Sequence, residues 1–120
     1  MYNIKFYKDR RGKSPVLDYL RELKNKNDKD SQIKLDKIND YIDTLSIHGK
    51  NAGEPYIKHL DGDIWELRPL RDRILFAAWI NGGFVLLHKF VKKTRKTPPD
   101  EIKRAKRELA DFIERSKKYE

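Results

Sequence analysis

Residues 64–97 constrain the fold more than any other part of the chain. They contain three short apolar runs, IWEL, RILFAAWI and FVLLHKFV, separated by a charged turn before Arg73 and by Asn81-Gly82-Gly83. Aromatic and β-branched residues between glycine and asparagine turns are typical of antiparallel strands. We therefore expect strands over residues 64–68, 73–80 and 84–91, the last two joined as a hairpin.

The residues before this stretch predict a strand and two helices. Residues 2–8 alternate between apolar and polar side chains, as in a half-buried strand. Ser14-Pro15 combines a hydroxyl N-cap with a proline at the first helical position, and an apolar stripe follows. A second amphipathic helix is expected to begin near Asp30 or Ser31 and to stop at Gly49. Residues 56–60 read as a short extended piece.

Residues 97–101 predict the start of a last helix, with a hydroxyl, two prolines and two acidic residues in the first turn. The expected element order is therefore β-α-α-β-β-β-α. This order is typical of an α+β fold, with two N-terminal helices and one C-terminal helix on a twisted antiparallel sheet. A chain of 120 residues is expected to form one domain, residues 1–120.

Positive charge is the main compositional signal. The chain has 28 lysine and arginine residues against 19 acidic residues, which gives a formal net charge of +9. One cluster has no acidic residue among its members, which are Lys89, Lys92, Lys93, Arg95 and Lys96. Five cations without a local acid repel one another, so we expect this cluster to bind a polyanion or an acidic protein.

Several kinds of chemistry find no support in the sequence. There is no cysteine, and the three histidines, His48, His59 and His88, show no metal-ligand spacing. No glycine-rich phosphate loop or nucleophile elbow occurs. We therefore expect no metal and no cofactor. Without a signal peptide or a membrane-spanning run, the expected location is the cytoplasm.

The strand register brings several cations together around one acid. Glu66 and Arg68 share a face of their strand, and Arg73 opens the next strand across a tight turn. Lys92 and Lys93 stand at the end of the last strand. Arginine forks match phosphate oxygens, so these residues could surround one phosphate, unless Glu66 only forms an internal ion pair with the arginines. Aromatic residues could stack a base if they face outward, the candidates being Tyr56, Trp65, Phe76 and Phe90.

Three segments carry a resemblance to a known superfamily: WELR at residues 65–68, RILF at 73–76, and LLHKFVKKT followed by KTP at 86–98. They resemble the RelE/ParE toxins, and most of all the HigB-type, phage-derived toxins of type II toxin–antitoxin systems. The resemblance covers nearly the whole chain. It implies a RelE-like fold and a ribosome-dependent endoribonuclease that cleaves translated mRNA.

The resemblance also implies roles for individual residues. The family's basic catalytic positions fall on Arg68, Arg73 and Lys93. Glu66 stands where RelE has a second lysine, and RelE's C-terminal tyrosine has no counterpart near Ile102. The general base is therefore open between Glu66, His88 and His59. The residues expected to bind RNA are Lys58, His59, Lys89, Lys92, Arg95 and Lys96.

The implied partners are the ribosome with its mRNA, and a HigA-type helix-turn-helix antitoxin that would bring promoter DNA only indirectly. No membrane partner is expected. Two alternatives remain from the sequence: a ParE-like inhibitor of DNA gyrase, and a basic nucleic-acid-binding module without catalysis. The gyrase inhibitor would leave mRNA intact, and the binding module would bind RNA or DNA in a salt-dependent way without cutting it.

Overall fold

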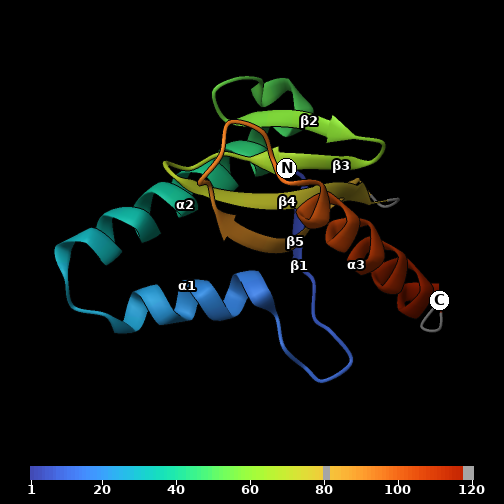
Figure 1. Ribbon diagram of the computed structural model, residues 1–120, viewed down its shortest axis with the longest axis horizontal. Coiled ribbons are helices and arrows are strands. Elements are labelled where there is room, and N and C mark those ends of the chain that lie inside the picture. The colour runs from blue at the N-terminus through green and yellow to red at the C-terminus, as the bar shows by residue number, and fades with distance from the viewer. Residues whose placement is uncertain (80–81, 118–120) are drawn as a thin grey trace.

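The computed structural model describes residues 1–79 and 82–117 and shows an α+β fold with three α-helices and a five-stranded sheet. Figure 1 shows α3 in front of the sheet and the C-terminal part of α2 behind it. The helices are α1 (Pro15–Asn25), α2 (Lys29–His48) and α3 (Pro99–Lys117), with a short 3-10 turn η1 (Gly49–Ala52). The strands are β1 (Asn3–Phe6), β2 (Ile57–Asp61), β3 (Ile64–Leu67), β4 (Asp72–Trp79) and β5 (Gly83–Val91).

The strand order is β1-β5-β4-β3-β2. The pairs β2·β3, β3·β4 and β4·β5 are antiparallel, as predicted. However, β1 pairs with β5 in parallel, so the sheet is mixed rather than wholly antiparallel. The extended piece at residues 56–60 is an edge strand, β2. The predicted strand 73–80 and the Asn81-Gly82-Gly83 turn include Ile80 and Asn81, which lie outside the described residues.

The helix boundaries follow local capping chemistry. α2 begins at Lys29 because the Asp28 carboxylate accepts a hydrogen bond from the Ser31 amide (2.9 Å). It stops at Gly49, as predicted, where φ is +59°. α1 begins at Pro15, also as predicted, but the Ser14 hydroxyl forms no cap hydrogen bond.

Two apolar clusters lie on opposite faces of the sheet. On one face, Ile38 and Leu45 of α2 and Val16 of α1 pack against a group that includes Phe76 and Leu86. On the other face, Ala105 and Leu109 of α3 belong to the cluster that contains Ile64, Leu75, Ala77, Val85 and Leu87. The sheet is covered on both faces, which explains why β4 and β5 read as nearly continuous apolar runs.

A register shift in the β4·β5 ladder changes the direction of side chains in β5. Phe76 pairs with Leu86 while the preceding residue, Leu75, pairs with His88, so Leu87 is an extra residue. Leu87 packs in the α3 cluster, and His88 also contacts α3. Within the described ranges, no helix is long and apolar enough to cross a membrane.

Candidate active site at the β3–β4 turn

Glu66, Arg68 and Arg73 form one charged group where β3 ends and β4 begins. The Glu66 Oε2 atom lies 3.6 Å from Arg68 Nε and 4.0 Å from Arg73 Nε. The short turn between the strands makes this possible: the Asp72 amide donates to the Pro69 carbonyl, and Leu70 has φ +57°. We call these three residues the arginine–glutamate group. The structure thus places Arg68 and Arg73 beside the same carboxylate.

The members of this group differ in exposure. Glu66 and Arg73 are buried, with 3% and 7% of their surface exposed, whereas the Arg68 side chain is 23% exposed. Arg73 Nη1 donates to the carbonyls of Leu70 and Asp72, at 2.8 and 2.9 Å, which fixes its side chain against the turn. Burial lowers the pKa of Arg73, an effect that the negative charge of Glu66 opposes.

The guanidinium groups retain hydrogen-bonding capacity. Among the described residues, the Nε atoms of Arg68 and Arg73 are buried and have no hydrogen-bond partner. Both atoms lie within 4.0 Å of Glu66 Oε2, so the two cations are ion-paired to this carboxylate at distances too long for a hydrogen bond. The Arg68 side chain is the more exposed of the two, so its guanidinium is the part of the group that an external acceptor such as a phosphate oxygen can reach.

Residues 92–98, which we call the strap, connect β5 to α3 and cross the strand ends near this group. Figure 1 shows this segment, in orange, passing over β4 and β3 before α3 begins. The Lys92 amide donates to the Arg71 carbonyl (2.8 Å), and the Thr97 hydroxyl donates to Glu66 Oε1 (2.6 Å). The strap is therefore attached at both ends to the β3–β4 region.

The strap carries most of the predicted basic cluster. Lys93, Arg95 and Lys96 are exposed, and Lys92 is half-buried. A pocket of 520 Å³ lies beside the strap, and its lining residues are Phe90, Val91, Lys93, Thr94, Pro98 and Glu101. Phe90 is also the ladder partner of Arg73, so this pocket adjoins the arginine–glutamate group. Lys93 is the predicted catalytic residue that faces this pocket.

Two of the predicted RNA-binding residues lie away from this group. Lys89 is on the opposite face of the sheet, where its Nζ atom lies 3.9 Å from the centre of the Tyr19 ring of α1. His59 packs against Trp65, with 5.0 Å between ring centres, and its Nε2 atom lies 2.8 Å from the Gly62 carbonyl. By contrast, the exposed Lys58 pairs directly with Glu66 across the β2·β3 ladder, so it stands beside the group.

His88 is fully buried beneath α3. Its Nδ1 atom lies 2.5 Å from Glu108 Oε1, and its Nε2 atom lies 3.4 Å from Glu101 Oε1. In the sheet, Leu75 separates it from Glu66, because Leu75 is the ladder partner of both. With strands spaced about 4.8 Å apart, His88 is about 10 Å from Glu66. The histidine therefore joins α3 to the sheet and does not belong to the arginine–glutamate group.

The aromatic candidates for base stacking are mostly part of the core. Phe76 is fully buried, and Tyr56 and Trp65 pack against the α1/α2 cluster. Phe90 is half-buried and lines the pocket beside the strap. Of the four candidates, Phe90 is the one placed next to the arginines.

Sequence reasoning missed three residues that organise this region. Thr97 was expected to matter only at the start of the helix, whereas its hydroxyl holds the Glu66 carboxylate. Glu101 and Glu108 of α3 both face His88. Their spacing of seven residues places them on one helical face, and this spacing could have predicted that both carboxylates meet the same partner. Within the described ranges, no group of three or more His, Cys, Asp or Glu residues could hold a metal ion.

Comparison with protein families gives a match. A family model described as phage derived protein Gp49-like (DUF891) matches residues 18–110, which is well over half of the chain. The matched region runs from α1 into α3 and includes the arginine–glutamate group and the strap. No curated protein matches this sequence.

Proposed function

The chain belongs to the phage-derived Gp49-like family, a RelE/toxin-like family, and from this premise we propose that it is the toxin of a type II toxin–antitoxin module. The proposed toxin is of HigB type and acts as a ribosome-dependent endoribonuclease on translated mRNA. It arrests translation by cutting the message, and it needs no metal ion.

One observation carries the catalytic part of this proposal: two guanidinium groups with unbonded Nε atoms flank a single buried carboxylate. Such preorganised donors stabilise charge that develops in a transition state, because their orientation is fixed before the reaction. The Nη1 bonds of Arg73 to the turn carbonyls supply that orientation. The site is therefore suited to a reaction that builds negative charge on phosphate oxygens.

In the proposed reaction, the ribose 2′-oxygen attacks the adjacent phosphorus atom and the bond to the 5′-oxygen of the next nucleotide breaks. The products are a 2′,3′-cyclic phosphate and a 5′-hydroxyl end. Glu66 accepts the proton from the 2′-hydroxyl, and Lys93 or Lys92 delivers a proton to the leaving 5′-oxygen. Arg68 and Arg73 bind the non-bridging oxygens of the phosphorane.

The surrounding cations bind the substrate and its carrier. Lys58 and the exposed strap residues Lys93, Arg95 and Lys96 provide positive charge on the same side as the arginine–glutamate group. We infer that they contact phosphates of the message and of ribosomal RNA. The ribosome would present one codon at the site and supply the orientation that a small site lacks. A HigA-type antitoxin with acidic residues would neutralise this surface.

The direct test is primer extension on translated mRNA after induced expression, comparing the wild type with Arg73→Ala. Loss of one preorganised donor is expected to lower cleavage about 100-fold or more. Arg71→Ala is the matched control, because Arg71 is exposed, lies in the same turn and contributes only its backbone carbonyl to the strap. Its cleavage should equal that of the wild type.

Because Arg73 is buried, its removal could unfold the chain, so Arg73→Lys serves as a second variant. It keeps the charge and loses the planar fork, and we expect a folded protein with reduced cleavage. Full cleavage by Arg68→Ala and by a folded Arg73 variant would remove the catalytic assignment. Growth arrest with intact mRNA would instead favour a ParE-like action on gyrase, and normal growth with intact mRNA would leave a binding module.

A further inference from the structure

The outer edge of β1 has a short segment whose backbone groups are available for hydrogen bonds, between two ends whose backbone groups are already bonded. In a parallel ladder, alternate residues bond to the neighbouring strand, and the Tyr7 amide donates to the Leu86 carbonyl of β5 (2.8 Å). The backbone N–H and C=O groups of the odd-numbered residues of β1 therefore point toward β5, and those of the even-numbered residues point away from it. β1 is an edge strand, so the outward groups belong to the free side of the sheet.

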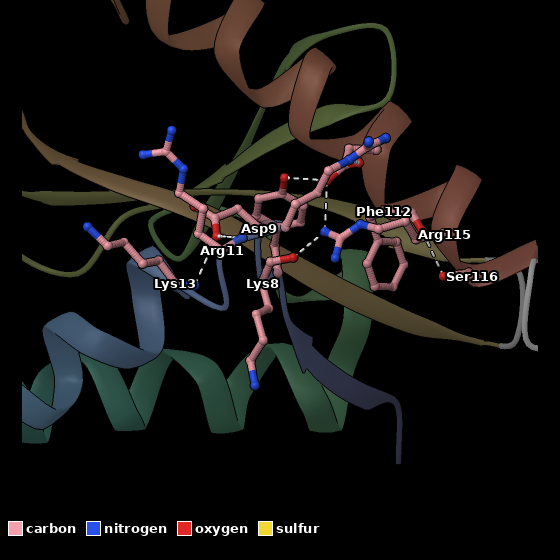
Figure 2. Close-up of polar contacts among 10 residues, drawn as sticks. Lys8, Asp9, Arg11, Lys13, Phe112, Arg115 and Ser116 are labelled. Atoms are coloured by element: carbon pink, nitrogen blue, oxygen red, sulfur yellow. Dashed lines mark hydrogen bonds and ion pairs between the residues drawn. The ribbon is translucent and has the colours of Figure 1, made fainter.

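Other parts of the chain use the outward groups at both ends of this edge. The Tyr2 amide donates to the Ser46 carbonyl of α2 (2.8 Å), and the Ser46 hydroxyl donates to the Tyr2 carbonyl (2.9 Å). At the other end, Arg115 of α3 donates to the Lys8 carbonyl, as Figure 2 shows. Between these ends, the alternation of the parallel ladder directs the backbone groups of Ile4 and Phe6 away from β5, and among the described residues no turn, loop or side-chain hydrogen bond involves them.

A basic groove adjoins the open segment. It has a volume of 280 Å³, and no acidic side chain is found among its lining residues in the part of the chain that the structure describes, which are Lys5, Phe6, Lys8, Phe112, Arg115 and Ser116. Figure 2 shows the Phe112 ring beside Arg115 and the Lys8 amino group projecting away from the contact. Lys5 and Lys8 are exposed, and Lys5 Nζ lies 4.2 Å from the centre of the Trp79 ring.

We propose that this edge binds an extended, acidic segment of a partner protein as an additional strand. The two N–H and two C=O groups of Ile4 and Phe6 match a polypeptide backbone, which both donates and accepts hydrogen bonds. A nucleic-acid phosphate only accepts, so it would leave the carbonyls unpaired. A second copy of this chain is disfavoured because each copy carries a net charge of +9 and Lys5 stands on the edge.

The partner segment has alternating acidic and apolar residues. Successive side chains of an added strand point to opposite faces, so every second one lies on the α3 face of the edge beside Lys5, whose Nζ atom stacks on Trp79. Acidic side chains on that face meet Lys5, while Lys8, which projects away from the contact in Figure 2, adds positive charge near the end of the same edge. The residues between them point to the other face, where Ile4 and Phe6 pack against the apolar cluster that α1 and α2 cover, so apolar side chains are favoured. This interaction does not depend on the proposed ribonuclease activity.

The test uses the full chain and a fluorescent ten-residue peptide of alternating valine and glutamate. Fluorescence anisotropy measures binding, and amide hydrogen exchange followed by NMR locates it. In the free protein, the Ile4 and Phe6 amides should exchange fast while those of Lys5 and Tyr7 are protected. Bound peptide should slow Ile4 and Phe6 at least about tenfold and leave the other two unchanged.

Charge-reversal variants separate this edge from general attraction. Lys5→Glu with Lys8→Glu should weaken peptide binding about tenfold or more. Lys24→Glu with Lys29→Glu changes the net charge equally at exposed positions in the α1–α2 hairpin and should bind like the wild type. Absence of binding, binding without protection of Ile4 and Phe6, or equal losses in both double variants would overturn the proposal. Equal protection by a short oligouridine would assign the edge to nucleic acid instead.

Discussion

Thr97→Val tests whether the strap is fastened to the arginine–glutamate group. The substitution replaces the hydroxyl by a methyl group of similar size and removes the 2.6 Å hydrogen bond to Glu66 Oε1. A hydrogen bond to a charged group is worth about 1.5–3 kcal/mol. Thr97 is half-buried, so water can replace part of the lost bond, and we expect a loss near the lower limit.

A loss of about 1.5 kcal/mol should lower Tm by about 6 °C in a domain of this size. Urea unfolding followed by tryptophan fluorescence, together with calorimetry, measures both quantities. Thr94→Val is the matched control, because Thr94 lies in the same strap, is exposed and donates only to the Lys96 carbonyl. Its effect should stay within about 0.5 kcal/mol.

A double-mutant cycle with Glu66→Ala isolates the interaction. If Thr97 acts through this carboxylate, Thr97→Val should have almost no effect on the free energy of unfolding in the Glu66→Ala background. The same loss in both backgrounds would refute the reasoning, as would a Thr97→Val effect no larger than that of Thr94→Val. Either result would mean that the strap is held by contacts other than this hydrogen bond.

Three further predictions concern other parts of the molecule. Burial and the hydrogen bond to Asp111 raise the pKa of Tyr7 to about 12. The protonated phenol therefore stabilises the fold fully below pH 10, and this stabilisation is lost as pH rises to about 12. In a series of urea unfolding curves at alkaline pH, Tyr7→Phe should lack this part of the decrease in the urea midpoint. If the proposed RNA-binding surface is correct, Lys96→Ala should reduce the salt slope of RNA affinity by about 1, whereas Lys89→Ala should leave it unchanged because Lys89 is on the opposite face. A Cβ atom at Gly83 would lie 2.6 Å from the Asn3 carbonyl oxygen, so Gly83→Ala should separate β1 from β5 and speed amide exchange at Lys5 and Tyr7.

The parts of the site that sequence reasoning predicted are those that depend on local geometry. Arg68 and Arg73 flank one tight turn between two strands, so their proximity to Glu66 follows from strand alternation and turn length. The cap at Gly49 and the start of α1 at Pro15 are local in the same sense. The roles of these residues in catalysis remain predictions, since the geometry supports them without testing them.

The sequence by itself determined the element types and the α+β class, because hydrophobic periodicity, turn residues and helix caps act over a few positions. Only the tertiary structure decided the parallel placement of β1 beside β5, the bulge that turns His88 toward α3 and the contact of Thr97 with Glu66. It also placed Lys89 against Tyr19 on the far face. These features join residues distant in the chain or depend on one inserted ladder residue, so the packing of the whole sheet between its helices sets them.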